Sequence, residues 1–300
     1  MINRLKGVFA PVVTTFARKT GELDLPAFAA NIREHFAAGL HGVVVTGSTG
    51  EAALLDAAER IALVDSARHE VPSDKVLIVG TGAESTRTCL HQTRDAAERG
   101  ADAVLVVAPH YYGPAMTGQA LTQHYVRVAD GSPVPVLLYN IPKYMHFSLS
   151  PDLVAELAAH ENIIGIKDSS GNRELLAAYL NVQSPTFAVL TGNAQIFQDA
   201  LAQGAYGGIL AVSLFAPGLC LDVYAAATAG NAEAGSAAHA RMSPLGAKIV
   251  AELGVAGVKA AMDHVGLAGG PVRSPLLPLD VAQRAGVEEL LRSAELATAA

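Results

Sequence analysis

Eight short, almost uninterrupted apolar runs recur along the chain, and most of them are rich in β-branched residues. Runs of this kind are typical of strands in a parallel sheet that is covered on both faces, because both sides of each strand are then buried. They set the number and the spacing of the strands. The runs cover residues 8–13, 42–45, 76–79, 103–107, 134–138, 163–166, 187–190 and 207–211.

The segments between these runs are amphipathic and carry the residues that begin and end helices. Asp24 and Pro26 mark the start of the first such segment, and Gly39 marks its end. A strand followed by a helix, eight times over residues 1–230, predicts a (β/α)8 barrel of the α/β class. A doubly wound sheet is the alternative, but eight repeats favour the barrel. Further helices are expected at residues 56–70, 85–100, 117–130, 150–159, 172–181, 194–202 and 217–229.

Residues 231–300 follow without a Ser/Gly-rich or charged linker and are rich in alanine, leucine and glutamate. We expect three helices there, at roughly residues 232–251, 254–266 and 280–296, interrupted by the segment 269–275. The predicted organisation is therefore a catalytic barrel in residues 1–230 and a C-terminal helical extension in residues 231–300, packed on the barrel as an appendage.

Composition narrows the class of protein. The chain is 51% hydrophobic and only 16% charged, which favours a large buried core over disorder. A net charge of −7 disfavours nucleic acid as a partner. Cys89 and Cys220 lie in apolar helical stretches, as core thiols do in a reducing compartment. The sequence has no signal-peptide pattern and no apolar stretch long enough to cross a membrane, so we expect a cytoplasmic protein that binds no membrane.

Two polar side chains stand at the ends of neighbouring predicted strands. Lys167 ends the apolar run that begins at Asn162, and Tyr139 ends the run before it. In a (β/α)8 barrel the reactive residues gather at the C-terminal ends of the strands. An amine can form an imine with a carbonyl and a phenol can relay protons, so this pair suits carbonyl chemistry. The amine must be neutral to attack. Burial favours the neutral form, whereas the neighbouring Asp168 opposes it unless its side chain points away.

Other chemistries find little support in the sequence. The turn 46–51 offers hydroxyls and backbone N–H groups that can hold a carboxylate, but it lacks the ending of a phosphate-binding loop. The glycines at Gly80 and Gly82 lack the third glycine of a dinucleotide fingerprint. The ten histidines show no metal-ligand spacing, and no Gly-x-Ser-x-Gly pattern is present. We therefore expect no cofactor and no metal.

Four stretches together resemble a known family. Residues 47–51 (Gly-Ser-Thr-Gly-Glu), 111–112 (Tyr-Tyr), 139–142 (Tyr-Asn-Ile-Pro) and 165–168 (Gly-Ile-Lys-Asp) have the order and about the spacing of the dihydrodipicolinate synthase / N-acetylneuraminate lyase family. The likeness runs from about residue 5 to residue 292. It implies a (β/α)8 barrel with a C-terminal helical extension, a homotetramer built as a dimer of dimers, and pyruvate or a pyruvate-derived 2-oxo acid as the substrate.

The resemblance also implies a role for individual residues. Lys167 would form the Schiff base, and Tyr139 would transfer the proton. Thr49 and Tyr112 would support Tyr139, with Tyr112 reaching in from a neighbouring subunit. The remaining implied residues bind the substrate: Ser48 and Thr49 would hold the pyruvate carboxylate, and Gly192 and Ile209 would line the floor beside it.

One position departs from the synthases of this family. They usually carry an arginine two residues after the proline of the Tyr-Asn-x-Pro stretch, and here that position is Tyr144. Lys143 is one position away and is taken as a solvated loop residue. Other stretches, including residues 82–86, 125–130, 254–263 and 269–271, are more similar to the 4-hydroxy-2-oxoglutarate aldolase branch, which also lacks the arginine.

These observations lead to three hypotheses. The first is a class I lyase that cleaves a 4-hydroxy-2-oxo acid, 4-hydroxy-2-oxoglutarate above all, to pyruvate and glyoxylate. The alternative is a dihydrodipicolinate synthase that condenses pyruvate with L-aspartate semialdehyde. The third is a barrel that binds a ligand and regulates without catalysis. The combination of Lys167, Tyr139, Thr49 and Tyr112 argues against the third, because binding alone does not need an amine beside a phenol.

Overall fold

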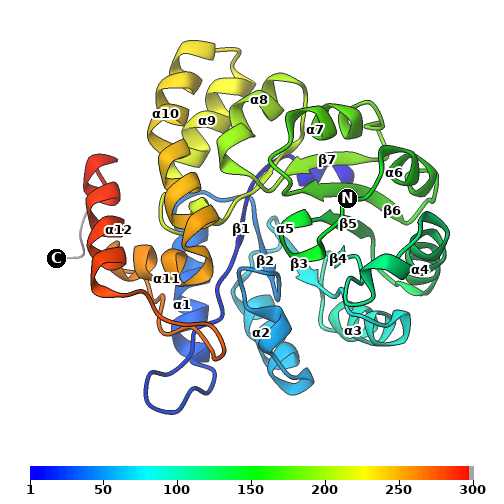
Figure 1. The fold of residues 1–300 in the computed structure, drawn as a ribbon, viewed down its shortest axis with the longest axis horizontal. Coiled ribbons are helices and arrows are strands. Elements are labelled where there is room, and N and C mark those ends of the chain that lie inside the picture. The colour runs from blue at the N-terminus through cyan, green and yellow to red at the C-terminus, as the bar shows by residue number, and fades with distance from the viewer. Residues whose placement is uncertain (297–300) are drawn as a thin grey trace.

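Eight parallel strands close into a barrel in the order β1 to β8, with β8 pairing back onto β1. The computed structural model describes residues 1–296 (Figure 1). The predicted (β/α)8 fold is confirmed, and each of the eight apolar runs overlaps one strand. The strands are β1 Gly7–Pro11, β2 Gly42–Val45, β3 Val76–Gly80, β4 Ala103–Val107, β5 Val136–Asn140, β6 Ile163–Asp168, β7 Ala188–Thr191 and β8 Gly207–Ile209.

The bounds of several strands differ from those of the apolar runs. β5 begins at Val136, two residues later than its apolar run, because Pro135 has no N–H to donate to the ladder. β6 runs on through Lys167 and Asp168, so both residues belong to the strand itself. All six residues of β6 are buried, and the alternation along a strand points the side chains of Lys167 and Asp168 to opposite faces.

Helices surround the barrel, and a side chain caps the N-terminus of most of them. Asp24 accepts a hydrogen bond from Ala27 N at the start of α1, as expected from the sequence. Asp56 and Glu59 form a capping box at the start of α2. The α-helices around the barrel are α1 Leu25–Ala37, α2 Ala57–Glu70, α3 Thr86–Glu98, α4 Gly118–Gly131, α5 Pro142–Met145, α6 Pro151–Leu157, α7 Arg173–Leu180, α8 Phe197–Ala202 and α9 Pro217–Thr228.

Short 3-10 turns lie at several loops: η1 Ile2–Leu5, η2 Ala52–Leu54, η3 Gly113–Ala115, η4 Ala194–Ile196 and η5 Ala211–Leu214. The helix α5 was not predicted, because its four residues are too few to show a helical period. This turn begins three residues after Tyr139 and places Lys143 and Tyr144 at the rim of the barrel, where both line the cavity described below.

The helices after residue 231 gather on one side of the barrel, and α10 lies alongside α9 (Figure 1). They are α10 Ala232–Leu245, the π-helical segment η6 Gly246–Glu252, α11 Gly254–His264 and α12 Val281–Ser293. The first predicted helix is thus interrupted. Pro244 lies inside α10 and lacks an N–H, and the hydrogen-bond pattern widens to π-helical just after it. The boundary at residue 230 stays a prediction, and residues 297–300 of the expected extension lie outside the described residues.

Apolar side chains fill both the barrel and the space between barrel and helices. Phe9, Leu77 and Leu137 are fully buried, as are Cys89 and Cys220, both of which are free thiols. Burial raises the pKa of the Cys89 thiol to about 12, which makes it an unreactive core residue. In residues 1–296, the longest apolar helices fall short of what crossing a bilayer would require.

Candidate active site

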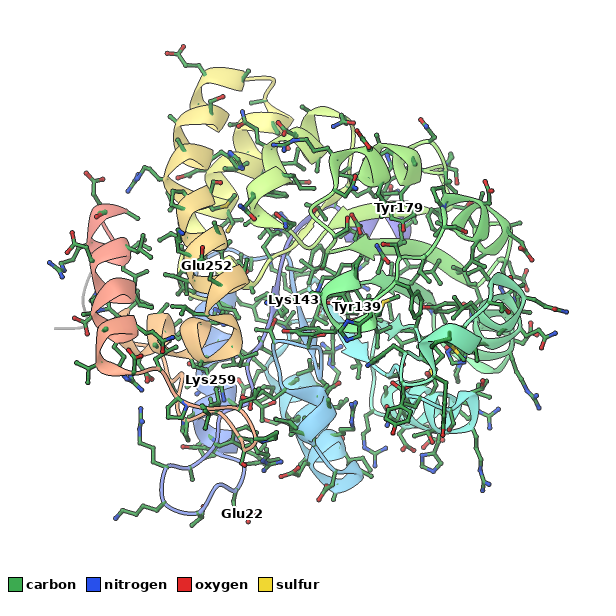
Figure 2. The ribbon with its side chains drawn as sticks, in the orientation of Figure 1. Glu22, Tyr139, Lys143, Tyr179, Glu252 and Lys259 are labelled. Atoms are coloured by element: carbon green, nitrogen blue, oxygen red, sulfur yellow. The ribbon has the colours of Figure 1, made fainter. Side chains whose placement is uncertain are left out.

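Lys167 and Tyr139 lie side by side at the C-terminal ends of β6 and β5. The two residues are paired in the register of the adjacent strands. Their side chains are 5% and 4% exposed, respectively. Lys167 Nζ lies 4.2 Å from the centroid of the Tyr139 ring. The structure therefore brings together the amine and the phenol that the sequence singles out, in a site largely closed to water. Tyr139 is labelled in Figure 2.

Asp168 is turned away from Lys167. Successive side chains of a strand point to opposite faces, and Asp168 faces the helices. Its carboxylate accepts hydrogen bonds from Asn140 Nδ2 at 2.8 Å and from Ser170 Oγ at 2.7 Å. Burial raises the pKa of Asp168, and these donors partly offset that rise. The Asp168 carboxylate is thus bound by Asn140 and Ser170 and points away from the Lys167 amine.

A cavity of about 140 Å³ opens over these two residues. It has room for a molecule of a few non-hydrogen atoms. Among the residues that the structure describes, two lysines, Lys143 and Lys167, line the cavity, and no carboxylate side chain does. The other polar lining residues are Ser48, Thr49, Tyr139, Tyr144, Ser169, Asn193 and Gln195. A cationic, hydroxyl-rich cavity suits a small anionic substrate.

Ser48 and Thr49 enter this cavity from the loop after β2. The loop is held in place by Thr46 Oγ1, which donates to Gly80 O at 2.9 Å, and by Thr14 Oγ1, which donates to Gly50 O at 2.6 Å. The hydroxyls and backbone N–H groups of Ser48 and Thr49 find no hydrogen-bond partner within residues 1–296. They are available to a bound carboxylate, as the glycine- and hydroxyl-rich sequence predicts.

Gly192 and Ile209 line the same cavity from the ends of β7 and β8. A Cβ atom at position 192 would lie 2.8 Å from Lys167 Cε and closer still to Ser169 Oγ. Glycine at position 192 therefore leaves room for the side chains of Lys167 and Ser169.

Tyr144 and Lys143 lie at the outer end of the cavity. Burial, and to a lesser degree the nearby Tyr139, raises the pKa of Tyr144, so its phenol remains a neutral donor. Lys143 was expected to be a solvated loop residue. Its side chain does reach solvent, but it also lines the cavity, and Nζ donates to Ala251 O at 2.8 Å.

Tyr112 is placed differently from the other predicted residues. Its side chain is 68% exposed, and the adjacent Tyr111 is 78% exposed. The two rings pack edge to face, with centroids 5.0 Å apart, on the outside of this chain. Within one described chain Tyr112 does not meet Tyr139, so its expected role depends on a neighbouring subunit.

A larger cavity, of about 840 Å³, lies between α2 and α3. Its lining includes Arg60, His91 and Arg94 but neither Lys167 nor Tyr139. A choice by cavity volume alone would therefore select a cavity that lacks the reactive side chains. The smaller cavity is the candidate active site, because it collects the reactive side chains at the C-terminal ends of the strands.

The residues that sequence reasoning missed come from the extension. Gly246, Val250, Val255 and Val258 form one wall of the active-site cavity. Their side chains are small or apolar and carry no pattern by which the sequence alone could assign them to a site. The helices after residue 231 thus contribute to the site.

Comparisons with known proteins agree with this geometry. Residues 4–294 match the model of the dihydrodipicolinate synthetase family. A 4-hydroxy-tetrahydrodipicolinate synthase of Methanospirillum hungatei is 37% identical over 95% of this chain and 97% of that protein. A synthase of the same name from Stenotrophomonas maltophilia is 37% identical over 95% of each chain.

Solved structures match the whole fold. YagE, a prophage protein of Escherichia coli K12 solved in complex with pyruvate, has a TM-score of 0.92 and 30% identity over 97% of this chain and 99% of its own. The chloride-inhibited dihydrodipicolinate synthase of Acinetobacter baumannii, also complexed with pyruvate, has a TM-score of 0.92 and 29% identity over 97% and 99%. A family model that spans nearly the whole chain, together with relatives matched along their full length, leaves one assignment. The chain belongs to the dihydrodipicolinate synthetase family and is a class I, pyruvate-dependent lyase.

Proposed function

We propose that this enzyme joins pyruvate to a small aldehyde, or cleaves the corresponding product, through a Schiff base on Lys167. The observation that carries this proposal is the buried pairing of Lys167 with Tyr139 at the end of adjacent strands. Membership of a class I family excludes the hypothesis of a barrel that only binds and regulates.

The proposed reaction begins at the pyruvate carbonyl. Neutral Lys167 Nζ attacks C2, and loss of water gives an iminium ion. The iminium withdraws electrons from the methyl carbon, which loses a proton and becomes an enamine carbon. That carbon attacks the aldehyde carbonyl, a new carbon–carbon bond forms, and the aldehyde oxygen takes up a proton. Release of the imine from Lys167, by water or by an amine within the product, returns the free lysine.

Tyr139 is proposed to carry protons to and from the carbonyl oxygens in these steps. Its phenol lies within the closed part of the site, so it can exchange protons without bulk water. Thr49 and a partner-subunit copy of Tyr112 would complete this relay. The large exposed fraction of Tyr112 supports that assignment, as well as the expected homotetramer. Ser48 and Thr49 would hold the pyruvate carboxylate, with Gly192 and Ile209 beside it.

L-Aspartate semialdehyde is the first candidate for the aldehyde. The relatives at 37% identity are named 4-hydroxy-tetrahydrodipicolinate synthases, and this chain is similar to them along nearly its full length. The order of preference expected from the sequence is therefore reversed. A cytoplasmic location, proposed from the two buried thiols, fits a biosynthetic enzyme of this type.

Cleavage of 4-hydroxy-2-oxoglutarate to pyruvate and glyoxylate is the second candidate, and Tyr144 favours it. At the outer end of the cavity a neutral phenol stands where the synthases usually carry an arginine. A phenol supplies one hydrogen bond and no charge to a distant carboxylate, whereas a guanidinium supplies a bidentate charged contact.

Two measurements test the proposal. Borohydride reduction in the presence of pyruvate is expected to inactivate the enzyme and to leave a pyruvyl adduct on the peptide that contains Lys167. An adduct on Lys143, or none, contradicts the assigned nucleophile. A side-by-side assay then compares pyruvate plus L-aspartate semialdehyde with 4-hydroxy-2-oxoglutarate. Turnover of the first pair at the higher kcat/KM supports the synthase, and the opposite order supports the aldolase.

A further inference from the structure

A buried ion pair lies beneath the active site and is not used by the reaction above. Lys259 of α11 and Glu51 of the loop after β2 are 1% and 3% exposed, and Nζ meets Glu51 Oε1 at 2.5 Å. Lys259 Nζ also donates to Pro271 O at 2.7 Å and lies 4.6 Å from the Phe16 ring centroid. Burial lowers the pKa of Lys259, and the Glu51 carboxylate counteracts this. Two charges withdrawn from water need such close pairing to remain charged.

Glu51 connects this pair to the substrate loop. It ends the loop with φ of 57°, a left-handed conformation that a non-glycine residue keeps only where its surroundings hold it. Its second carboxylate oxygen accepts from Arg273 N at 2.8 Å. The preceding carbonyl, Gly50 O, accepts from Thr14 Oγ1 at 2.6 Å. Contacts to the Glu51 side chain and to the Gly50 carbonyl thus hold the end of the segment that carries Ser48 and Thr49.

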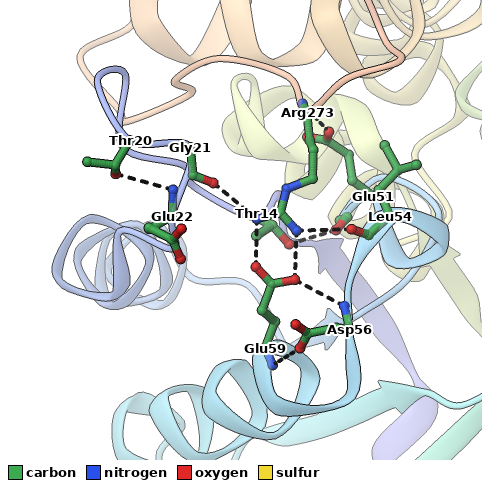
Figure 3. A network of polar contacts seen from close by, with 10 residues as sticks. Thr14, Thr20, Gly21, Glu22, Glu51, Leu54, Asp56, Glu59 and Arg273 are labelled. Carbon is green, nitrogen blue, oxygen red and sulfur yellow. Dashed lines mark hydrogen bonds and ion pairs between the residues drawn. The ribbon is translucent and has the colours of Figure 1, made fainter.

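Arg273 ties a second part of the extension to the same region (Figure 3). Its guanidinium binds both carboxylate oxygens of Glu59 at 2.6 Å and donates to Leu54 O at 2.9 Å. The same group stacks 4.2 Å from the Phe16 ring centroid. Both cations of this network come from residues after 231. Of the two carboxylates, Glu51 lies between β2 and α2, and Glu59 lies in the first turn of α2.

The two segments that carry Glu51 and Lys259 also line the active-site cavity. Ser48 and Thr49 lie three and two residues before Glu51, and Val255 and Val258 lie on the same helix as Lys259. A displacement at the ion pair would therefore move two walls of the cavity relative to each other.

We propose that Glu51 and Lys259 are positioning residues, whose ion pair sets the Ser48–Thr49 loop at the correct distance from Lys167 to receive the pyruvate carboxylate. This inference rests on the proposed role of Ser48 and Thr49. It goes further by assigning a function to the C-terminal extension: the extension holds part of the substrate-binding loop in place.

The test compares Glu51→Gln, Lys259→Met and the double variant with wild type. Lys248→Met is the matched control, because it also removes a lysine from the extension, but an exposed one whose partner is Glu252 four residues on. Borohydride trapping at increasing pyruvate concentration gives the half-saturating concentration for each protein. The thermal midpoint is measured alongside, and trapping is carried out well below the lowest midpoint.

Each single variant is expected to need roughly tenfold more pyruvate for half-maximal trapping, since a misplaced contact of about 1 Å can cost up to 10²-fold. The thermal midpoint should fall in the single variants, because one charge is left buried without its partner, and should recover in the double variant. The weak trapping is expected to persist in the double variant, because the loop has still lost its anchor. The Lys248→Met control should match wild type.

Two outcomes overturn the inference. Folded variants that are half-saturated at the wild-type pyruvate concentration would show that the pair acts on stability alone. A double variant that regains both the midpoint and the wild-type concentration would lead to the same conclusion. A wild-type enzyme that pyruvate and borohydride do not modify would instead refute the proposed function, so the two failures are distinguishable.

Discussion

Replacing Gly192 with alanine is expected to damage the active site without unfolding the barrel. The backbone φ of Gly192 lies outside the left-handed region, so alanine can adopt it. The added methyl group is the whole perturbation. It would lie 2.8 Å from Lys167 Cε and nearer still to Ser169 Oγ, whereas ordinary contacts begin at 3.4 Å.

The structure gives the size of the effect. To restore a 3.4 Å contact, the end of the Lys167 side chain must move by roughly 0.6 Å, and Ser169 must move further. Displacements of this order cost about 10- to 100-fold in rate where reacting groups have to be aligned. We therefore expect the rate constant for borohydride trapping with saturating pyruvate to fall by about that factor. Flexible side-chain ends can yield, so the thermal midpoint should change little.

Gly218→Ala is the matched control. Gly218 lies in the first turn of α9, and a Cβ there would meet no atom within 4 Å. This variant should trap pyruvate like wild type. The steric account of Gly192 is refuted if Gly192→Ala traps pyruvate at the wild-type rate, or if Gly218→Ala is impaired to the same degree.

Two further predictions concern stability. His35 is 1% exposed, burial lowers its pKa to about 4, and its Nε2 has no partner within the described chain. Above pH 6.5 it is neutral in both states, but below that the unfolded chain gains a proton that the folded one resists. The free energy of unfolding should therefore fall by up to about 3 kcal/mol between pH 6.5 and 4. Urea unfolding measured over this range should depend less on pH in His35→Leu than in His69→Leu, a control variant at an exposed histidine. Asn140→Ala removes the 2.8 Å donor to Asp168 and the acceptor for Leu149 N. It should cost about 1–3 kcal/mol of unfolding free energy, and an unchanged urea midpoint would contradict the importance of this pair.

The barrel could be predicted because its signals are local. Each strand is a short apolar run, and the count of eight with helices between them leaves few other topologies. Lys167 and Tyr139 could be found for the same reason, since a polar residue that ends a buried strand stands out. They are 28 residues apart in sequence, but they lie side by side because β5 and β6 are neighbouring strands.

The anchoring network could not be predicted, because a charged residue in a sequence looks the same whether it is buried or exposed. Glu51 and Arg273 are 222 residues apart, and their contact depends on how the extension packs. Lys143 is solvated as expected, but its contact with the extension could not be predicted, for a related reason. Whether its amine stays in solvent or reaches Ala251 O depends on the position of η6, which follows an irregular helix.

The position of Arg273 and Lys259 in the chain also bears on how the enzyme is made. Domains generally fold from the N-terminus while the ribosome is still adding residues. All eight strands have emerged once residue 209 is free, so the sheet can close early. Glu51 and Glu59 lack their partners Lys259 and Arg273 until those residues have left the ribosome. With the role proposed above for Glu51 and Lys259, a nascent chain can thus have a complete barrel while its substrate loop still lacks both anchors from the extension.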